Sequence, residues 1–170
     1  GRFLTEDLRR QIHRQSRLVE AQQVLLRQLK VRARSRAELI GTLHRRGFDD
    51  ALIDDALTKL ERLGLVDDEG FARDLADSLL RRQGLGRRGL HYRLTQRGID
   101  DGAANAAVAE ALEGADELQR AVDSLRLKLP RWEDLPPATR RARAYQFLAR
   151  RGFEQDAIAD ALSTVLPDEQ

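Results

Sequence analysis

One short pattern occurs three times in this chain: a leucine, three further residues, a glycine, and then a phenylalanine or isoleucine. The copies are Leu43/Gly47/Phe48, Leu94/Gly98/Ile99 and Leu148/Gly152/Phe153. If each glycine is the left-handed residue that ends a helix, the leucine and the final apolar residue form the contact pair of a Schellman cap. The glycines are separated by 51 and 54 residues, which is too long for a two-helix repeat and long enough for three helices.

Apolar residues return at the same helical distances after each copy of the pattern. They are Ile53, Ala56 and Leu57, then Ala104, Ala107 and Val108, then Ile158, Ala161 and Leu162. No segment alternates apolar and polar residues between turn signals, so strands are not expected. The sequence predicts an all-α fold with an N-terminal helix over 1–18 and three-helix repeats over 19–65, 66–115 and 116–170. Repeats that contact only their neighbours form elongated bodies.

Helix boundaries can be read at several other places. Ser35 and Glu38 have the spacing of a capping box, and either Asp49 or Asp50 is expected to begin the next helix. The same leucine and glycine pattern recurs at Gly64 and Gly84 and predicts two more helix ends. Trp132 lies in a proline-containing loop, where it is expected to anchor the loop on the helices, with a partner contact as the alternative.

Composition limits the function classes. The 170 residues include no cysteine, so disulfides, thiolate metal sites and cysteine nucleophiles are excluded. No apolar run of about 18 residues could span a membrane, and a cytoplasmic location without a membrane partner is the expectation. The formal net charge is only +2, so the distribution of charge is more informative than its sum. The chain does not begin with Met, which suggests that the natural protein starts upstream.

Basic residues gather on the second helix of each predicted repeat and on its flanks, whereas the third helices begin with acids. Cations at helix ends are explained by the helix dipole; these are Arg45, Arg46, Arg97, Arg150 and Arg151. That explanation does not cover arginines before or inside the helix, for which contact with phosphate or with an acidic protein face is the alternative. The candidate binding residues are Arg32, Arg34, Arg36, Arg81, Arg82, Arg87, Arg88, Arg93, Arg140, Arg141 and Arg143.

Catalytic and cofactor chemistry has no support in the sequence. The string Gly84-Leu85-Gly86-Arg87-Arg88-Gly89 matches GxGxxG, but the dinucleotide fingerprint requires a preceding strand, and residues 71–83 have a helical pattern. The three histidines are far apart and none has a second metal ligand at helical spacing. Tyr92 is the only aromatic residue within the basic stretch, so contacts to a nucleic-acid backbone are favoured over base stacking. We therefore expect no catalytic residue, no metal and no cofactor.

Several motifs taken in order resemble the RecX family. They are Arg34-Ser35-x-x-Glu38-Leu39, Gly64-Leu65-Val66-Asp67-Asp68-x-x-Phe71-Ala72, Gly98-Ile99 and Tyr145-x-Phe147-Leu148-x-Arg150-Arg151-Gly152-Phe153. The match extends over residues 21–162. Two positions depart from the family pattern: Glu154 stands where a capping residue such as serine is usual, and the second repeat has the small column Ala103, Ala104 and Ala107.

The resemblance implies three tandem three-helix repeats in a curved body, a monomer, and a regulator of the RecA recombinase. Such proteins bind the groove of the RecA nucleoprotein filament and inhibit its ATPase, strand-exchange and co-protease activities, which links them to DNA repair, recombination and the SOS response. It also implies a secondary capacity to bind single- or double-stranded DNA. The alternatives are a helix-turn-helix-like DNA-binding regulator, against which the acidic third helices argue, and an enzyme, for which no motif speaks.

Overall fold

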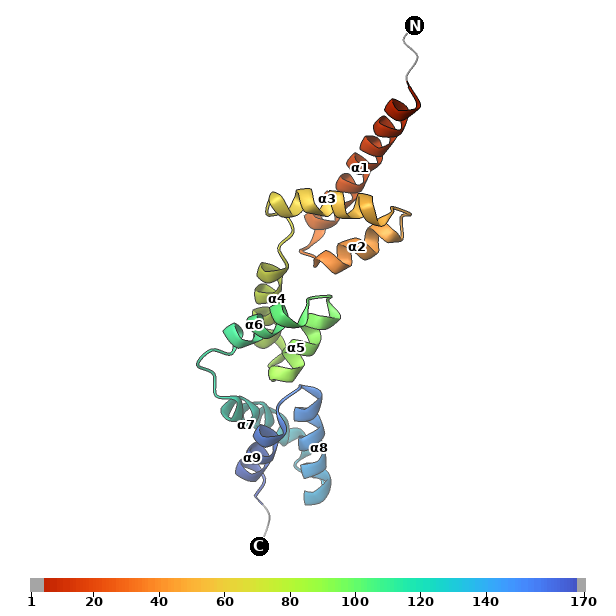
Figure 1. Ribbon diagram of the computed structural model, residues 1–170. Coiled ribbons are helices and arrows are strands. Elements are labelled where there is room, and N and C mark those ends of the chain that lie inside the picture. Colours follow the sequence, from red (N-terminus) through yellow and green to blue (C-terminus); the bar gives the residue numbers. More distant parts are fainter. Residues whose placement is uncertain (1–4, 168–170) are drawn as a thin grey trace. The chain divides into compact units, whose positions relative to one another are not determined.

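The computed structural model describes residues 5–167, and the expectations that fall on residues 1–4 and 168–170 lie outside this part. Residues 5–167 contain helices and no strand, so the all-α prediction is confirmed (Figure 1). The elements are α1 (Glu6–Val31), α2 (Arg36–His44), α3 (Asp50–Arg62), α4 (Asp68–Gln83), α5 (Arg87–Gln96), α6 (Asp101–Ala111), α7 (Glu117–Lys128), the 3-10 helix η1 (Leu129–Trp132), α8 (Pro137–Arg150) and α9 (Gln155–Val165).

The chain divides into two compact units. The first unit comprises residues 1–71 together with 97–99, and the second comprises residues 72–96 and 100–170. The core of the first unit is made by α1, α2 and α3, with Leu25, Leu39, Leu43 and Leu57 all fully buried. These residues recur at the helical spacing that predicted one apolar face per helix.

The N-terminal helix expected over residues 1–18 is not separate from the first repeat. The helix α1 runs without interruption from Glu6 to Val31, because this segment contains neither glycine nor proline and nothing else in it ends a helix. Its C-terminal half packs in the core through Ala21, Val24 and Leu25. Leu8 and Ile12, in its N-terminal half, are 42% and 52% exposed, so this end of α1 lies outside the core.

The second unit holds most of the second repeat and all of the third. In the second repeat Leu90, Leu94 and Ala104 are fully buried. In the third, α7, α8 and α9 enclose Leu125, Leu148 and Phe153. The Trp132 ring meets the Phe147 ring edge-on at 5.9 Å between centroids, so Trp132 anchors its loop on α8 as the sequence suggested. This contact ties η1 to the core of the third repeat.

Backbone hydrogen bonds confirm the predicted helix ends at Gly47, Gly64 and Gly152, and the positive φ of Gly98 together with the end of α5 at Gln96 confirms the end there. At Gly47 the Phe48 N–H donates to the Leu43 carbonyl at 3.2 Å, and the equivalent bond at Gly152 joins Phe153 to Leu148 at 3.3 Å. Both glycines have positive φ angles, which define the Schellman geometry. Gly84 makes a single bond to Leu80 instead. Gly114 adds a positive-φ turn that the repeat pattern did not indicate.

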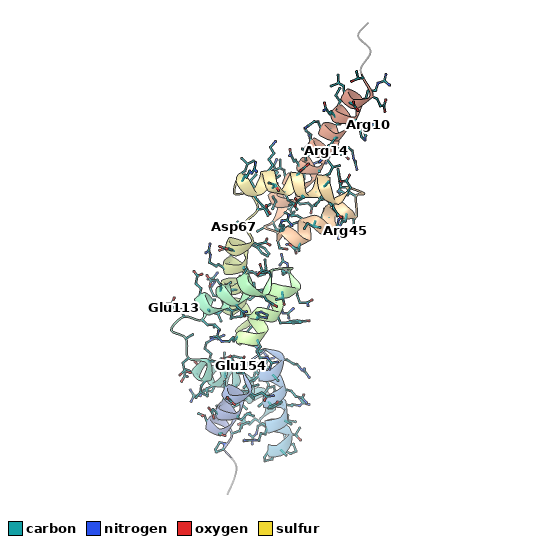
Figure 2. All side chains as sticks on the ribbon, in the orientation of Figure 1. Arg10, Arg14, Arg45, Asp67, Glu113 and Glu154 are labelled. Atoms are coloured by element: carbon teal, nitrogen blue, oxygen red, sulfur yellow. The ribbon has the colours of Figure 1, made fainter. Side chains whose placement is uncertain are left out.

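The helix starts also follow the sequence. Ser35 and Glu38 form the predicted capping box, and Asp49 rather than Asp50 caps α3. Asp67, labelled in Figure 2, accepts the Gly70 N–H at 3.0 Å and caps α4. Glu154, also labelled there, begins α9 without a side-chain cap. The departure from the family pattern at Glu154 therefore removes one capping hydrogen bond.

Candidate interaction surface

Each unit contains a place where the turn after one helix packs against the start of another. In the first unit the turn at Arg97 and Gly98 packs on the start of α2, and we call this contact, between residues 35–38 and 97–98, the first joint. The Ser35 hydroxyl donates to the Arg97 carbonyl. A Cβ on Gly98 would lie 2.4 Å from the Ala37 Cβ, so only glycine permits this approach.

An ionic cluster covers the first joint. Glu38 accepts from Arg97 Nε at 2.7 Å, from Arg32 Nη2 at 3.1 Å and from the Ser35 N–H at 3.2 Å. The Arg97 guanidinium also lies 5.0 Å from the centre of the Phe71 ring. Burial alone would raise the pKa of Glu38, but the hydrogen bonds from Arg97, Arg32 and Ser35 lower that pKa to about 2. Glu38 is therefore a structural carboxylate in this unit.

The second joint is built from backbone. The turn at Arg151 and Gly152 packs on residues 86–89 at the start of α5, within the second unit. The Gly86 N–H donates to the Arg151 carbonyl at 2.9 Å, and the Arg88 and Gly89 N–H groups donate to the Gly152 carbonyl at 3.0 and 3.3 Å. Amides at a helix start have no intrahelical acceptor, so the carbonyls of the docked turn satisfy them.

Glycine is required on both sides of the second joint. A Cβ on Gly89 would lie 2.1 Å from the Arg151 carbonyl oxygen, and a Cβ on Gly152 would lie 2.0 Å from the Gly89 nitrogen. A helix, α4, precedes the string over residues 84–89, which excludes the dinucleotide fingerprint for it. Gly86 and Gly89 instead let two backbones approach within hydrogen-bonding distance.

Two half-buried arginines support the second joint. Arg151 donates from Nη1 to the Gln83 carbonyl at 2.6 Å, and its guanidinium lies 4.4 Å from the centre of the Phe147 ring. Arg120 donates to the Leu85 carbonyl. Burial lowers the pKa of both side chains, because a low-dielectric surrounding disfavours the charged form. Arg151 was attributed to the helix dipole from the sequence, and its contacts show a packing role as well.

The candidate arginines of the first unit are largely engaged within that unit. Arg32 pairs with Glu38, and Arg36 pairs with Asp54 and Glu61, each at 2.8 Å. Arg34 is half-buried, and its Nε has no hydrogen-bond partner among the described residues. Arg32 and Arg36 therefore stabilise the first unit, and a partner would have to compete with these carboxylates for them.

Most candidate arginines of the second unit are exposed and free of carboxylates. Within residues 5–167 no ion pair forms at Arg82, Arg87, Arg88, Arg93 or Arg143, and all five are exposed. Arg81 has only a 4.0 Å contact with Asp77. Arg140 is half-buried, and Arg141 donates to the Leu166 carbonyl at 2.6 Å. The free cations thus come from α4, α5 and α8.

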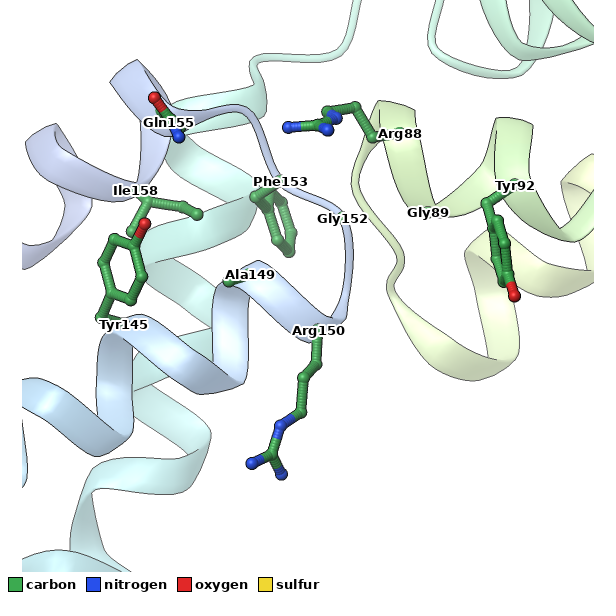
Figure 3. A pocket seen from close by; sticks show the side chains of 10 residues that line it. All are labelled: Arg88, Gly89, Tyr92, Tyr145, Ala149, Arg150, Gly152, Phe153, Gln155 and Ile158. Atoms are coloured by element: carbon green, nitrogen blue, oxygen red, sulfur yellow. The ribbon is translucent and has the colours of Figure 1, made fainter.

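A cavity of about 310 Å³ lies between α5 and the α8–α9 turn (Figure 3). Tyr92 from α5 and Tyr145 from α8 both line it, 58% and 45% exposed, and Arg88 extends across its upper rim. Arg150, at the end of α8, also lines it. Tyr145 was missed as a site residue because it lies 53 residues from Tyr92 in the sequence. Tyr145 and His91 occupy equivalent positions in the repeat, each three residues before the leucine of the repeated pattern. Because His91 is next to Tyr92, this equivalence could have pointed to Tyr145.

A second cavity, of about 460 Å³, lies on the other side of Arg150. It is lined by Trp132, Arg143, Gln146, Phe147, Arg150 and Arg151. Neither cavity has an aspartate or glutamate among its lining residues. Together they form an acid-free surface over α5 and α8, to which arginine and aromatic side chains both contribute.

These observations define a class of protein: a tandem three-helix repeat protein with an exposed cationic surface. Among the described residues, no group of three or more acidic, histidine or cysteine side chains could hold a metal ion. None of the helices in that range is both long and apolar enough to cross a membrane.

Comparison with protein families identifies the particular one. The chain matches the models of the first, second and third three-helix domains of RecX over residues 21–60, 67–108 and 115–162. The chain belongs to the RecX family.

Curated relatives agree over most of the chain. The regulatory protein RecX of Mycolicibacterium smegmatis is 39% identical over 157 residues, which cover 89% of this chain and 82% of that protein. The protein of the same name from Chlorobaculum tepidum is 35% identical and covers 85% and 87%. These matches support a regulatory role and confirm the resemblance drawn from the motifs.

Solved structures share the fold. A crystal structure of RecX from Lactobacillus salivarius has a TM-score of 0.74 at 20% identity and covers 87% of this chain and 96% of that chain. A crystal structure of regulatory protein RecX has a TM-score of 0.79 at 21% identity, with coverages of 99% and 82%.

Proposed function

We propose that this protein regulates the RecA recombinase by binding the RecA nucleoprotein filament and inhibiting its ATPase, strand-exchange and co-protease activities. It would thereby modulate DNA repair, recombination and the SOS response in the cytoplasm. Membership of a family of regulatory proteins supports the general role. The acid-free surface of the second unit supports the choice of an anionic partner.

The observation that carries this proposal is the set of free arginines on α4, α5 and α8. The side chains of Arg82, Arg87, Arg88, Arg93 and Arg143 form no ion pair among the described residues, although the Arg87 backbone N–H donates to the Glu117 carboxylate at 3.2 Å. A nucleoprotein filament presents phosphates and acidic side chains, and unpaired guanidinium groups bind both through bidentate hydrogen bonds. Arg32 and Arg36, although candidates from the sequence, are assigned a smaller part because carboxylates already hold them.

Direct contact with DNA belongs to the same proposal. The surface lies on helices that expose arginine on one face, and phosphate contacts of this kind are largely independent of base sequence. A sequence-specific helix-turn-helix function gains no support, because the third helices begin with acids such as Asp50, Asp101 and Asp156. These would repel phosphates at the position where such a protein reads bases.

Charge reversal tests the proposal. The variant Arg81→Glu/Arg82→Glu/Arg87→Glu/Arg88→Glu should lose inhibition of the ATPase of RecA filaments formed on single-stranded DNA. A control with Arg27→Glu/Arg46→Glu/Arg62→Glu makes nearly the same change in charge at exposed arginines of the first unit that form no ion pair within residues 5–167. Retained inhibition by a folded quadruple variant would refute the assignment of this surface.

A further inference from the structure

The two acid-free cavities share Arg150, and five aromatic side chains line them, among which Tyr92, Tyr145 and Trp132 come from three different elements. We call the set Arg88, Tyr92, Tyr145, Arg150, Arg143 and Trp132 the aromatic–arginine track. All six residues belong to the second unit, and each lines one of the two cavities. Tyr92 comes from α5, Tyr145 from α8 and Trp132 from η1.

The geometry points to a single-stranded nucleic acid as the ligand of this track: we propose that its bases stack on Tyr92 and Tyr145 while its phosphates contact Arg88 and Arg150. This inference deepens the DNA contact proposed above by giving it a site and a mode. Backbone contact alone was expected from the sequence, since only Tyr92 lay within the basic stretch. The juxtaposition of Tyr145 with Tyr92 changes that expectation.

The tyrosines are placed for stacking rather than for packing. Buried aromatic side chains account for much of a core, but Tyr92 and Tyr145 are 58% and 45% exposed. Both line one cavity, and Figure 3 shows Tyr145 beside Ile158 and Tyr92 on α5, with Phe153 and Gly152 between them. Neither hydroxyl has a hydrogen-bond partner among the described residues, so a structural hydrogen bond does not explain either residue. Exposed aromatic rings over a basic groove are the arrangement that binds single strands without base specificity.

The distribution of charged residues indicates which class of ligand the track binds and over which helices the track extends. Arg88, Arg143 and Arg150 have no ion-pair partner within residues 5–167, and no acid lines either cavity. Asp101 and Glu154 line a neighbouring hollow to which Arg88 and Tyr92 also contribute, so a polyanion is disfavoured on the α6 side of these two residues. The track therefore continues from α5 onto α8. An acidic peptide would satisfy the arginines but would leave the aromatic rings without a stacking partner.

Duplex DNA does not fit the same features. Its bases are stacked within the helix, so their faces cannot reach tyrosine rings unless the duplex opens. A cavity of about 310 Å³ is at the lower end of the range of roughly 300–1,000 Å³ for pockets that enclose small organic ligands. One unstacked base fits such a space. The preferred ligand is accordingly an unpaired strand.

Titration of the intact chain with three probes of equal charge tests this inference without RecA. The probes are a thymidine oligonucleotide, an abasic oligomer of the same length with the same phosphates, and a polyglutamate peptide. Trp132 is the only tryptophan, so its fluorescence reports on the track. The thymidine strand should bind more tightly than the abasic strand by roughly 5- to 150-fold per stacked base, and polyglutamate should bind most weakly.

Variants assign the effect to the tyrosines. Tyr92→Ala/Tyr145→Ala should remove the preference for the thymidine strand, while Tyr92→Phe/Tyr145→Phe should retain it, because phenylalanine keeps the ring. Arg88→Gln/Arg150→Gln should weaken binding of both strands. Equal affinity for the thymidine and abasic strands, an unchanged preference in the alanine variant, or tighter binding of polyglutamate would each overturn the proposal. Loss of ATPase inhibition is read in a separate assay, so the two proposals fail independently.

Discussion

The two joints place equivalent residues in the same contact and stabilise it by different chemistry. In the first joint the Ser35 hydroxyl meets the carbonyl of the docked turn, and Glu38 with Arg97 covers the contact. In the second joint, the Gly86 N–H donates to the Arg151 carbonyl and the Gly89 N–H donates to the Gly152 carbonyl. Side chains therefore make the first joint, whereas backbone hydrogen bonds make the second, with support from the Arg151 and Arg120 side chains. The repeat preserves the contact without preserving the interactions that hold it.

The difference has a consequence for the surface. Glu38 occupies the repeat column that holds Gly89 in the second repeat and Arg143 in the third. In the first unit the Glu38 carboxylate forms ion pairs with Arg32 and Arg97. With glycine and arginine at the other two copies, the arginines of the second unit have no such partner.

The largest expected effect comes from disrupting the second joint. Gly152→Ala should lower the free energy of unfolding by about 3 kcal/mol or more, because it places a Cβ 2.0 Å from the Gly89 nitrogen and breaks backbone hydrogen bonds of about 1 kcal/mol each. Urea denaturation followed by circular dichroism measures it. Gly114→Ala is the control, since Gly114 also has positive φ but nothing within 4 Å of its Cβ. Equal losses would mean that Gly152 serves backbone conformation alone.

A smaller loss is expected when the first joint loses its serine. Ser35→Ala should lower the free energy of unfolding by about 2 kcal/mol, because the buried hydroxyl both caps α2 and donates to the Arg97 carbonyl. Thr5→Ala removes an exposed cap that supports no joint and should cost less than about 1 kcal/mol. The same denaturation assay compares them. If both variants lost the same amount, the contact of Ser35 with Arg97 would contribute nothing.

The first joint should also depend on pH. Because the folded pKa of Glu38 is about 2, below its ordinary value of 4.5, its contribution is present above about pH 4.5 and disappears as pH falls toward 2. Glu38→Gln should be less stable than the parent chain by about 1–2 kcal/mol at neutral pH, with the difference vanishing in acid. Denaturation across pH measures this. Glu113→Gln, at an exposed carboxylate without an ion pair in residues 5–167, should show no such trend.

The smallest expected effect is that salt weakens the first joint but not the second. At about 1 M NaCl the screening length is roughly 3 Å, so the ion pairs of Glu38 weaken while the backbone bonds of the second joint do not. Hydrogen exchange at the Glu38 amide should accelerate about two- to fivefold, which corresponds to less than about 1 kcal/mol. The amides of Arg88 and Gly89 should stay unchanged. Acceleration at all three amides would show that both joints open together.

Much of the fold could be read from local signals. Helix ends at Gly47 and Gly152 and the helix start at Ser35 depend on residues within one turn, so spacing alone predicted them. The continuous α1 was not predicted, because the N-terminal helix was placed over 1–18, outside the repeats, and the first repeat was started at 19, although no stop signal lies between them. A helix continues by default where nothing ends it.

The surface was less accessible to sequence reasoning, because it depends on which distant residues meet. Arg36 was a candidate for binding until the fold brought Asp54 and Glu61 to it. From the sequence Tyr145 was only a position in the repeat alignment, whereas the structure shows that it lines the same cavity as Tyr92. Gly86 and Gly89 belong to a string that was rejected as a nucleotide-binding motif, and the structure shows that they bind the turn at Arg151 and Gly152. Composition could not distinguish paired from unpaired arginines, because tertiary contacts decide that.

The most direct test of the account compares the free arginines of the second unit with free arginines of the first. Arg82→Gln/Arg87→Gln/Arg88→Gln and Arg27→Gln/Arg46→Gln/Arg62→Gln each remove three positive charges, and both would be cosedimented with RecA filaments on single-stranded DNA across a salt series. The first variant should bind about tenfold or more weakly at low salt, with a slope of log affinity against log salt that is shallower by about 2–3, and the second should match the parent chain. Equal losses in both variants would contradict the account.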